Sequence, residues 1–485
     1  MFHTPPGSGP CLNDAIAKSR HRAGFASVSS TLVLKLKDNK ERQVFCKILN
    51  LLKMTAVKSD SILIVGAGVF GLSTALELNK RGYTDITVVD RFVPPSADGS
   101  SVDISRIIRS DYADPIYSQM AREAFEGWTT EYKDQFFQSG FALFSDTPKN
   151  AYMEGSKAVT RAAGGKLDDL DDAMDIRKLY PSVQAELSGM NGYHNARGGW
   201  ADAAGSIQKL ASKCTVAGVS IIAGPRGTVT SLRRAGSQVV GVNLVGGQVL
   251  LASRVILSAG AWTNRLLNIG HAATSTGQPV GFIQLTEEEA YEMRKIPVMI
   301  NMSSGVFSFP PTPDTNVLKL ARHGYGYATD IQVDVDGVKK SVSSPKFETS
   351  NAATGYLPDD ADESLRKGLR QFFPKLGDRP WINRRLCWYT ETPKGDFIID
   401  HHPTIKGLFM ATGGSGHGFK FLPVLGKYIA DCFENKAPEN LRQKWRMTPP
   451  PDVDSKSSVL GDGKSDGSRG GPPLRRLSPF EQAKL

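Results

Sequence analysis

Three glycines carry the first chemical signal in the chain, at the spacing Gly66-x-Gly68-x-x-Gly71. In such a turn the first glycine permits a tight bend, the second lets backbone N–H groups approach a pyrophosphate, and the third lets a helix pack closely on a strand. Val69 and Phe70 lie inside the turn and belong to the same predicted contact. The spacing therefore predicts a site for the phosphates of a dinucleotide at the start of a helix.

The elements around these glycines follow in the order that such a site requires. Residues 61–65 form a short apolar run, typical of a strand that is buried on both faces. Apolar residues then recur at helical spacing over 72–76, and the segment 80–82 ends the helix with a glycine. The next apolar run closes on Asp90, whose carboxylate we expect to accept hydrogen bonds from ribose hydroxyls. Strand, turn, helix, strand and acid together indicate dinucleotide binding, although they do not separate NAD from FAD.

The segment 218–262 favours FAD. It predicts two or three short strands, among them 227–229 and 239–242, followed by an apolar strand over 254–258 and small residues at 259–261. This order is typical of FAD-binding folds of the glutathione-reductase and amino-acid-oxidase kind. The sequence has no second complete glycine motif of the type that NAD would use.

Two further regions, 99–109 and 387–421, complete a resemblance to a known family. Residues 99–109 are Gly-Ser-Ser-Val-Asp-Ile-Ser-Arg-Ile-Ile-Arg. Cys-Trp-Tyr-Thr stands at 387–390, Phe-Ile-Ile-Asp-His-His-Pro at 397–403, and Gly-Ser-Gly-His-Gly-Phe-Lys-Phe at 414–421. With the glycine turn, these segments resemble the monomeric sarcosine oxidase family, which includes pipecolate oxidase, fungal saccharopine oxidase and the fructosyl amino acid oxidases. The similarity covers nearly all of 58–440.

The resemblance implies roles for the matching residues. Cys387 matches the cysteine that forms a thioether to the 8α-methyl group of the flavin, and a buried free cysteine is the alternative. Arg106 matches an arginine near the flavin ring, and Tyr389 a ring that lines the substrate pocket. Arg109 and Lys420 match the cations that bind the substrate carboxylate, a task suited to an arginine fork. A surface ion pair is the alternative for either cation.

The other expected contacts to FAD come from the same segments. They are Arg91, Ser100, Ser101, Val229, Gly416 and His417, with Lys420 as a cation that also reaches the cofactor. His417 lies on the loop over the flavin, where a polar contact to the cofactor and a structural role are equally compatible with the sequence. No metal site is predicted.

One departure from the family pattern concerns oxygen. Members of the family place a lysine above the flavin, shortly before a hydrophobic strand, where it assists electron transfer to O₂. The comparable stretch here is 274–285, and no lysine occurs from 214 to 294. Either another cation serves, with Lys319 and Arg322 as possible sources, or the reactivity toward oxygen is altered.

The implied reaction is the FAD-dependent oxidation of a secondary amine or N-substituted amino acid to an imine, with O₂ reduced to H₂O₂. The segment 103–109 resembles saccharopine and pipecolate oxidases more than it resembles typical fructosyl amino acid oxidases. Alternatives in the same class are a fructosyl amino acid oxidase and an alkaloid-pathway oxidase of an N-methylated aromatic amino acid. A flavin-binding protein without turnover and an NAD-dependent dehydrogenase are the alternatives outside it.

The sequence predicts an α/β fold with two interleaved parts. A Rossmann-like FAD-binding domain is expected from 57–115, 196–270 and 386–440. An α+β substrate domain on a mostly antiparallel sheet is expected from 116–195 and 271–385. Family members are often monomers, so the resemblance implies a monomer.

Composition narrows the possible partners. The 485 residues carry a net charge of +10, but 1–53 alone hold nine Lys and Arg against three acids, so no basic face for nucleic acid is predicted on the folded body. No run of 18 apolar residues predicts a membrane span. Five scattered cysteines without a Cys-x-x-Cys pair argue against a disulfide scaffold or a zinc site.

The two ends differ from the body of the chain. Residues 1–53 are predicted to be a disordered or non-native extension, with a transit peptide as the alternative. Residues 449–485 are rich in Pro, Gly and Ser and predict a flexible tail. The tail closes on Ala483-Lys484-Leu485, which resembles the Ser-Lys-Leu peroxisomal address and implies a peroxisomal import receptor as a partner.

Overall fold

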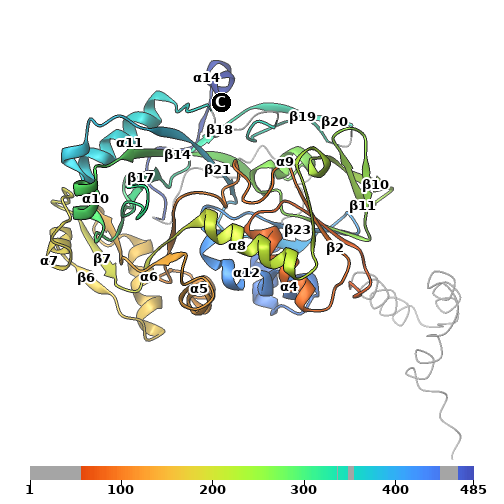
Figure 1. Cartoon of the computed structure of the whole chain (residues 1–485), viewed down its shortest axis with the longest axis horizontal. Coiled ribbons are helices and arrows are strands. Elements are labelled where there is room, and N and C mark those ends of the chain that lie inside the picture. The colour runs from red at the N-terminus through yellow and green to blue at the C-terminus, as the bar shows by residue number, and fades with distance from the viewer. Residues whose placement is uncertain (1–55, 336, 348–353, 448–467) are drawn as a thin grey trace, which may run out of the picture. The chain divides into compact units, whose positions relative to one another are not determined.

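The computed structural model describes residues 56–335, 337–347, 354–447 and 468–485. Two large sheets organise this part of the chain, and helices cover them (Figure 1). The predicted α/β class is confirmed. The extension predicted over 1–53 lies outside the described residues.

The first sheet has six strands in the order β22-β23-β13-β1-β2-β9. Neighbours are parallel except for β22 and β23, which are antiparallel. The strands are β1 Ile62–Val65, β2 Ile86–Asp90, β9 Ser220–Ala223, β13 Arg254–Leu257, β22 Ile398–His401 and β23 Leu408–Thr412. The central strands β1 and β13 carry short apolar runs, as parallel strands covered on both faces require.

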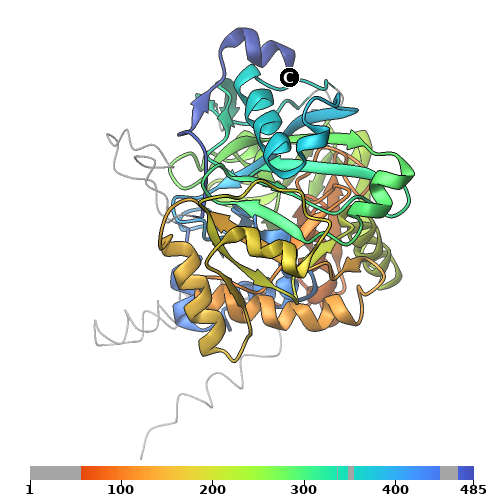
Figure 2. The ribbon, with the colours of Figure 1, turned by 90° about the vertical axis from the view of Figure 1, so that its left-hand side faces the viewer.

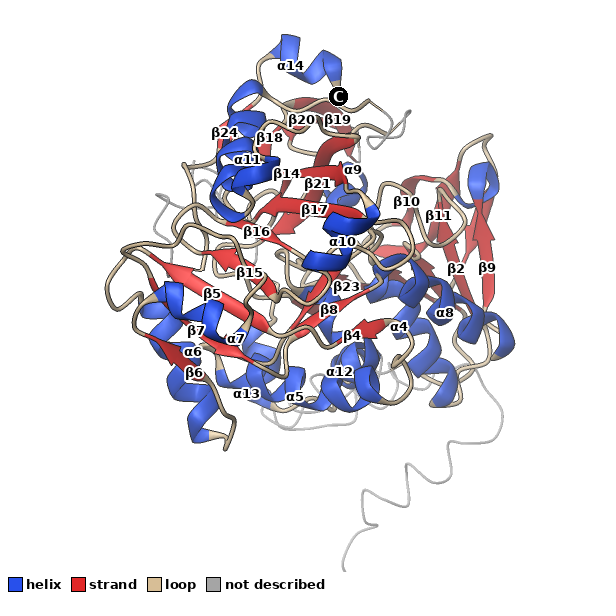
Figure 3. Cartoon of the chain, turned by 60° about the vertical axis from the view of Figure 1, so that its left-hand side comes forward, coloured by secondary structure: helices blue, strands red, loops and turns tan. Residues whose placement is uncertain are grey.

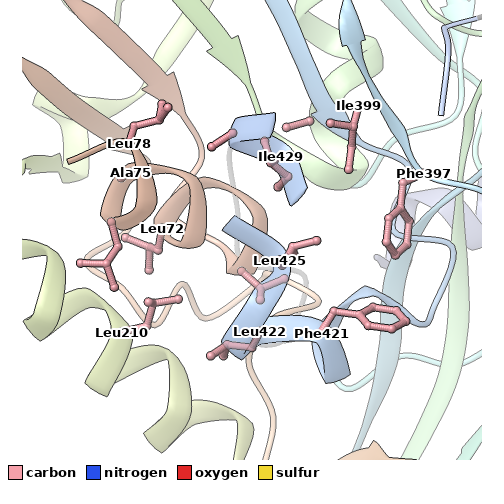
Figure 4. Packing of buried hydrophobic residues seen from close by; sticks show 14 of the residues in the cluster. Leu72, Ala75, Leu78, Leu210, Phe397, Ile399, Phe421, Leu422, Leu425 and Ile429 are labelled. Atoms are coloured by element: carbon pink, nitrogen blue, oxygen red, sulfur yellow. The ribbon is translucent and has the colours of Figure 1, made fainter. Parts of the chain in front are cut away.

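Successive side chains of β1 point to opposite faces of the sheet and join two different apolar clusters. Ile62 and Ile64 join an apolar cluster with helices α4 (Val69–Lys80), α8 (Ala203–Val216) and α12 (Leu422–Phe433). Leu63 and Val65 pack toward β10, β11 and β12, which form a three-stranded sheet over Val229–Ala235, Gln238–Leu244 and Val249–Leu251. Figure 4 shows the helical side, where leucines of α4, α8 and α12 meet. Burial on both faces, predicted for this strand, is confirmed.

The second sheet has ten strands and is mostly antiparallel. Its order is β24-β18-β14-β17-β16-β15-β5-β7-β6, and β21 also pairs with β14. Figure 3 shows this sheet beside the helices α10 (Glu287–Met293) and α11 (Asp359–Phe372). The strands are β5 Phe141–Ser145, β6 Asp168–Leu170, β7 Asn191–Asn195, β14 Thr274–Gln284, β15 Val298–Asn301, β16 Val306–Ser308, β17 Val317–Arg322, β18 Tyr327–Ala328, β21 Asn383–Glu391 and β24 Arg475–Arg476.

Smaller elements join the two sheets. Strand β8 (Gly199–Ala201) pairs with β3 (Arg106–Ile108) and β4 (Phe136–Phe137), and β19 (Ile331–Val335) forms a hairpin with β20 (Val338–Val342). The remaining α-helices are α5 Pro115–Thr129, α6 Ala151–Ala162, α7 Ile176–Leu179, α9 Thr263–Leu266, α13 Glu439–Lys444 and α14 Pro479–Lys484. Figure 2 shows α14 near the C-terminal end. No helix within the described ranges has both the length and the apolar character needed to cross a membrane.

Two elements do not pack in the part of the fold for which they were predicted. Strand β21 pairs along its full length with β14 in the ten-stranded sheet, although most of it was predicted for the FAD-binding part. Helix α5 packs in the core of the FAD-binding part, although it was predicted for the substrate part, and Trp128 on it donates a hydrogen bond of 2.7 Å to the carbonyl oxygen of Lys420. The domain limits of 57–115, 116–195 and 386–440 stay predictions, and these two elements connect the parts.

The prediction of a flexible tail over 449–485 is wrong for 468–485. This stretch adds β24 to the sheet and forms α14, whose Ser478 and Glu481 make a capping box. Leu477 and Leu485 are buried in an apolar cluster, and these two anchors offset the ordering of a segment whose average composition is polar. The first part of the predicted tail lies outside the described residues.

Candidate active site

The glycine turn joins β1 to α4 at the carboxyl edge of the parallel sheet. Gly66 has a φ of +111°, and a Cβ there would overlap the carbonyl oxygen of Ser258. A Cβ on Gly71 would overlap the carbonyl oxygen of Gly66. Gly68 is the N-cap of α4 and brings no side chain over the first turn of the helix. Only glycine fits at the first and third positions, which is the arrangement that binds phosphate groups at a helix start.

Asp90 stands beside this turn at the end of β2. Its Oδ2 accepts a hydrogen bond of 2.7 Å from the N–H of Ala67, and its Oδ1 accepts one of 3.0 Å from the N–H of Phe92. Burial raises the pKa of Asp90, and the two backbone hydrogen bonds oppose that shift. The carboxylate is thus held at the edge of the cleft, where ribose hydroxyls are predicted to lie.

A cleft extends from the turn and collects most of the predicted cofactor contacts. Arg91 lines it with a guanidinium held by Asp98 at 2.8 Å and placed 5.0 Å from the ring of Trp262. Gly71 packs against the turn and does not line the cleft. The predicted residues that do are Gly66, Gly68, Val69, Phe70, Asp90, Arg91, Ser100, Ser101, Arg106, Val229, Gly416 and His417.

A second cavity of about 650 Å³ adjoins the cleft. Arg106 and Tyr389 line both, and Cys387 lines the second. A glycine turn with room for phosphates, an acid beside it and a neighbouring cavity lined by a cysteine correspond to the groups expected around FAD. The residues present therefore fit FAD.

Three neighbouring strands present side chains to the second cavity. Cys387 and Tyr389 come from β21, Gln278 from β14, and Lys319 and Ala321 from β17. The register places Cys387 opposite Gln278. Because alternate residues of a strand face the same side, positions 387 and 389, and likewise 319 and 321, point to the cavity together.

The same alternation places Lys319 and Arg322, the two possible replacements for the expected lysine, on opposite sides of β17. Lys319 lines the cavity, whereas Arg322 faces the opposite side, where it donates hydrogen bonds to Ser364 Oγ at 2.8 Å and to the hydroxyl of Tyr327 at 3.2 Å. Of the two possible cations, only Lys319 therefore faces the cavity, from the strand next to the stretch 274–285.

Lys319 belongs to a buried ionic cluster. Its Nζ lies 2.9 Å from Asp103 Oδ2 and donates a hydrogen bond of 2.8 Å to the carbonyl oxygen of Ser105. Arg106 and Arg385 contact the same carboxylate at 2.7 and 3.2 Å. Burial lowers the pKa of Lys319 to about 7, and the Asp103 carboxylate opposes that shift. Burial also disfavours the charge on Asp103, but the three cations hold the pKa of that carboxyl well below its usual range.

Arg109 and Lys420 lie in the same cavity, and both lie over the ring of Tyr112. The guanidinium and the ammonium are 4.7 and 5.3 Å from the centre of the Tyr112 ring. Asp111 and the hydroxyl of Tyr152 hold the guanidinium, the latter at 2.7 Å. The ammonium donates a hydrogen bond of 3.1 Å to the carbonyl oxygen of residue 417. Burial and the neighbouring guanidinium lower the pKa of Lys420 well below its usual value. A guanidinium and a lysine side chain that both lie against the ring of Tyr112 in a buried cavity are suited to binding an anion.

His417 satisfies both of its ring nitrogens within the protein. Nε2 donates a hydrogen bond of 2.8 Å to the carbonyl oxygen of Gly395, so Nδ1 accepts the one of 3.2 Å from the hydroxyl of Tyr112. The imidazole is neutral, because burial lowers its pKa well below the usual value. This geometry favours the structural role for His417.

His323 lines the second cavity and was not predicted. Its ring centre lies 6.0 Å from that of Tyr389. Burial, followed by the nearby Arg469, lowers the pKa of His323 well below its usual value. The strand alternation that includes 319 and 321 extends to 323 and was the signal that could have found it.

Comparisons with known proteins agree with the FAD site that these residues indicate. The profile of the family described as DAO, FAD-dependent oxidoreductase, matches residues 61–432. The L-saccharopine oxidase of Schizosaccharomyces pombe is 34% identical over 420 residues, which cover 83% of this chain and 95% of that protein. An amino acid oxidase of Aspergillus fumigatus is 32% identical over 466 residues, covering 78% and 93%. The solved structure of the fructosamine oxidase Amadoriase II of Aspergillus fumigatus, in complex with FSA, aligns with a TM-score of 0.75 at 30% identity, covering 87% of this chain and 96% of that one.

Proposed function

The chain belongs to the DAO family of FAD-dependent oxidoreductases, and we propose that it oxidises a secondary amine or N-substituted amino acid that carries a carboxylate, with O₂ as the electron acceptor. The observation that carries this proposal is the pair Arg109 and Lys420, buried in the cavity that also contains Cys387. A carboxylate bound there lies in the cavity that adjoins the cleft of the glycine turn.

The protein contributes mainly orientation and electrostatics. When bound, FAD would supply the redox chemistry, as the acceptor of a hydride from the carbon next to nitrogen and the donor of two electrons to O₂. Arg109 and Lys420 hold the carboxylate and so fix the position of that carbon. Burial disfavours a charged ammonium in the cavity and favours a neutral amine. When the amine binds in that form, no protein base needs to remove a proton from it.

Cys387 is proposed to bind FAD covalently. The Nη2 of Arg106 lies 3.7 Å from the Sγ of Cys387, so a guanidinium faces the sulfur. When FAD is bound, its 8α carbon would supply the partner for a thioether with Sγ, with loss of the thiol proton and one methyl hydrogen and with O₂ as the final acceptor of the two electrons released. Two of the three cysteines among the described residues are buried on α8 and α12. The third, Cys387, is the only one of them that lines the cavity.

A substrate panel tests the proposal. Saccharopine, pipecolate, sarcosine, fructosyl-valine and N-methyl-tyrosine, each assayed for peroxide with the purified yellow protein, separate the members of the class. We expect peroxide from at least one carboxylate-bearing secondary amine, and less from the same compound as its carboxamide. Absence of peroxide from the whole panel, with flavin bound, would favour the flavin-binding protein without turnover.

Lys319 is proposed to assist the reduction of O₂, which creates negative charge inside the cavity. Replacing Lys319 with methionine should slow the oxygen-dependent step at least tenfold and leave the substrate-dependent step within about threefold, as measured by stopped flow. The charged form of Lys319 is lost as pH rises through about 7, so the oxygen step of the wild type should slow over that range. In Lys319→Met, the rate of the oxygen-dependent step should not change with pH over this range.

The exposed Lys340, changed to methionine, is the matched control and should leave both steps unchanged. Equal slowing of both steps in Lys319→Met would assign the residue a structural role in the Asp103 cluster. An unchanged oxygen step would remove it from the reaction.

Peroxisomal import is proposed from Ala483-Lys484-Leu485. Leu485 is 5% exposed, and its carbonyl oxygen accepts a hydrogen bond of 2.8 Å from Lys346 Nζ, so the last turn must leave the body before a receptor can bind it. Deleting 483–485 should change a punctate distribution to a diffuse one without loss of activity. Lys346→Ala, which frees the end without altering it, should remain punctate. Puncta after the deletion would refute import through this tripeptide.

A further inference from the structure

The C-terminal part of the described chain returns to the wall of the second cavity. Ser468 and Arg469 line this cavity, and the chain then runs to the edge of the ten-stranded sheet, where β24 pairs in parallel with β18. Figure 1 shows α14 and the C-terminus beside β18. A segment whose composition predicted a flexible tail therefore forms part of the candidate active site.

Close backbone packing fixes this segment. The N–H of Gly470 donates to the carbonyl oxygen of His323 at 3.3 Å, and that of Gly471 donates to the carbonyl oxygen of Ser303 at 3.2 Å. A Cβ on Gly470 would overlap the carbonyl oxygen of Met302. With the backbone held on both sides, the position of the preceding arginine is set by the fold.

An ion pair fixes the side chain of Arg469. Its Nη2 contacts the carboxylate of Glu391, which is fully buried, and its Nη1 donates to the carbonyl oxygen of Gly324 at 3.4 Å. Glu391 ends β21, two residues after Tyr389 and four after Cys387, so the three share one side of that strand. The Arg469 side chain is 11% exposed, and its charge is thus held at the cavity wall rather than in solvent.

The permanent positive charge of the cavity wall is on its arginines. Arg106, Arg109 and Arg469 line the cavity and stay charged, whereas burial lowers the pKa of Lys319 and Lys420. Arg469 pairs with Glu391 at the wall, and an anionic ligand that accepts a hydrogen bond from the same guanidinium adds a further favourable contact.

We propose that Arg469 binds a second acidic group of the substrate, at a distance from the carboxylate that Arg109 and Lys420 hold. A guanidinium offers a planar fork that matches a carboxylate, and a buried wall strengthens the attraction. The preferred substrates are then amines with two carboxylates, and the C-terminal segment determines specificity. The inference rests on the proposed function for the first carboxylate.

Ligand binding tests this inference without turnover. Dicarboxylates of five to seven carbons and the monocarboxylates of the same lengths serve as probes, titrated by calorimetry into the full-length holoprotein. We expect the best dicarboxylate to bind more tightly than its monocarboxylate partner. Arg469→Gln should weaken dicarboxylate binding at least tenfold and monocarboxylate binding less than threefold, and Arg469→Lys should keep most of the difference.

A change at Glu391 should act in the opposite direction. Glu391→Gln removes the acid that neutralises Arg469 and should tighten dicarboxylate binding, whereas structural damage would weaken it. The double variant Glu391→Gln with Arg469→Gln removes both charges, so no buried charge is left without its partner. It should bind dicarboxylates as weakly as Arg469→Gln. Arg476→Gln, on the same segment but exposed, is the matched control and should change neither probe.

Three outcomes would overturn the inference. They are equal loss of both probes in Arg469→Gln, no loss in that variant, and no preference of the wild type for dicarboxylates. These readouts remain valid if the amine panel gives no peroxide, so failure of the inference and failure of the proposed reaction are distinguishable.

Discussion

Replacing Cys387 with serine should abolish covalently bound flavin. A hydroxyl is a far weaker nucleophile than a thiolate, and Cys387 is the cysteine that lines the cavity in the described part of the chain. After acid precipitation, the wild-type polypeptide should remain yellow and carry a mass increase equal to one FAD. Under the same treatment, Cys387→Ser should give a colourless pellet of unmodified mass. FAD should still bind to the folded variant without a covalent link, because the glycine turn and the cleft are unchanged.

Cys432→Ser is the matched control. Cys432 is buried on α12, away from the cavity, and burial raises the pKa of its thiol to about 12, so the residue is a poor nucleophile. This variant should keep the adduct. An adduct that persists in Cys387→Ser would assign the link to another residue, and a wild type without any adduct would show that FAD is held by non-covalent contacts alone.

Replacing Arg109 with glutamine should lower kcat/KM for a carboxylate-bearing amine by roughly 10- to 150-fold. This range follows from the loss of about 1.5–3 kcal/mol when a hydrogen bond between charged groups is removed. Glutamine keeps a polar side chain beside Asp111 and Tyr152 but removes the charge and the fork that pair with a carboxylate. Steady-state kinetics with the acid and its carboxamide measure the effect. The acid should lose most of its advantage, whereas the carboxamide should change little.

Two controls separate binding from folding. Arg122→Gln, at an exposed arginine on α5, should leave kcat/KM unchanged. The flavin content of Arg109→Gln should equal that of the wild type, because Arg109 does not line the cofactor cleft. If the acid and the carboxamide lose activity equally in Arg109→Gln, the arginine supports the fold and does not bind the carboxylate.

Local segments of the sequence were enough to predict the nucleotide-binding start. Gly66 and Gly71 occupy positions where any side chain would overlap the backbone, so the residue type reports the conformation directly. The apolar run at 61–65 likewise reports burial on both faces. Such features depend on residues close in the chain, so a short sequence motif is enough to predict them. The family resemblance extended the prediction to Cys387, Arg109 and Lys420, which the fold brings into one cavity.

Features made by distant segments could not be predicted in this way. Asp103 gathers cations from three other elements, and nothing near it in sequence indicates which lysine completes the cluster. The pairing of Glu391 with Arg469 joins the strand of the cysteine to a segment whose composition predicted disorder. In that segment two buried leucines and close glycine contacts decide the outcome, and average polarity conceals them.

The sequence by itself determined the α/β class, the phosphate-binding turn, the choice of FAD over NAD and the residues that mark an amine-oxidising flavoprotein. Only the tertiary structure decided that Lys319 rather than Arg322 faces the cavity, that His417 is held by protein groups, and that the C-terminal segment lines the site. The physical reason is that backbone conformation depends on adjacent residues, whereas the side of a strand that meets a cavity, and the partner of a buried charge, depend on which distant elements pack together.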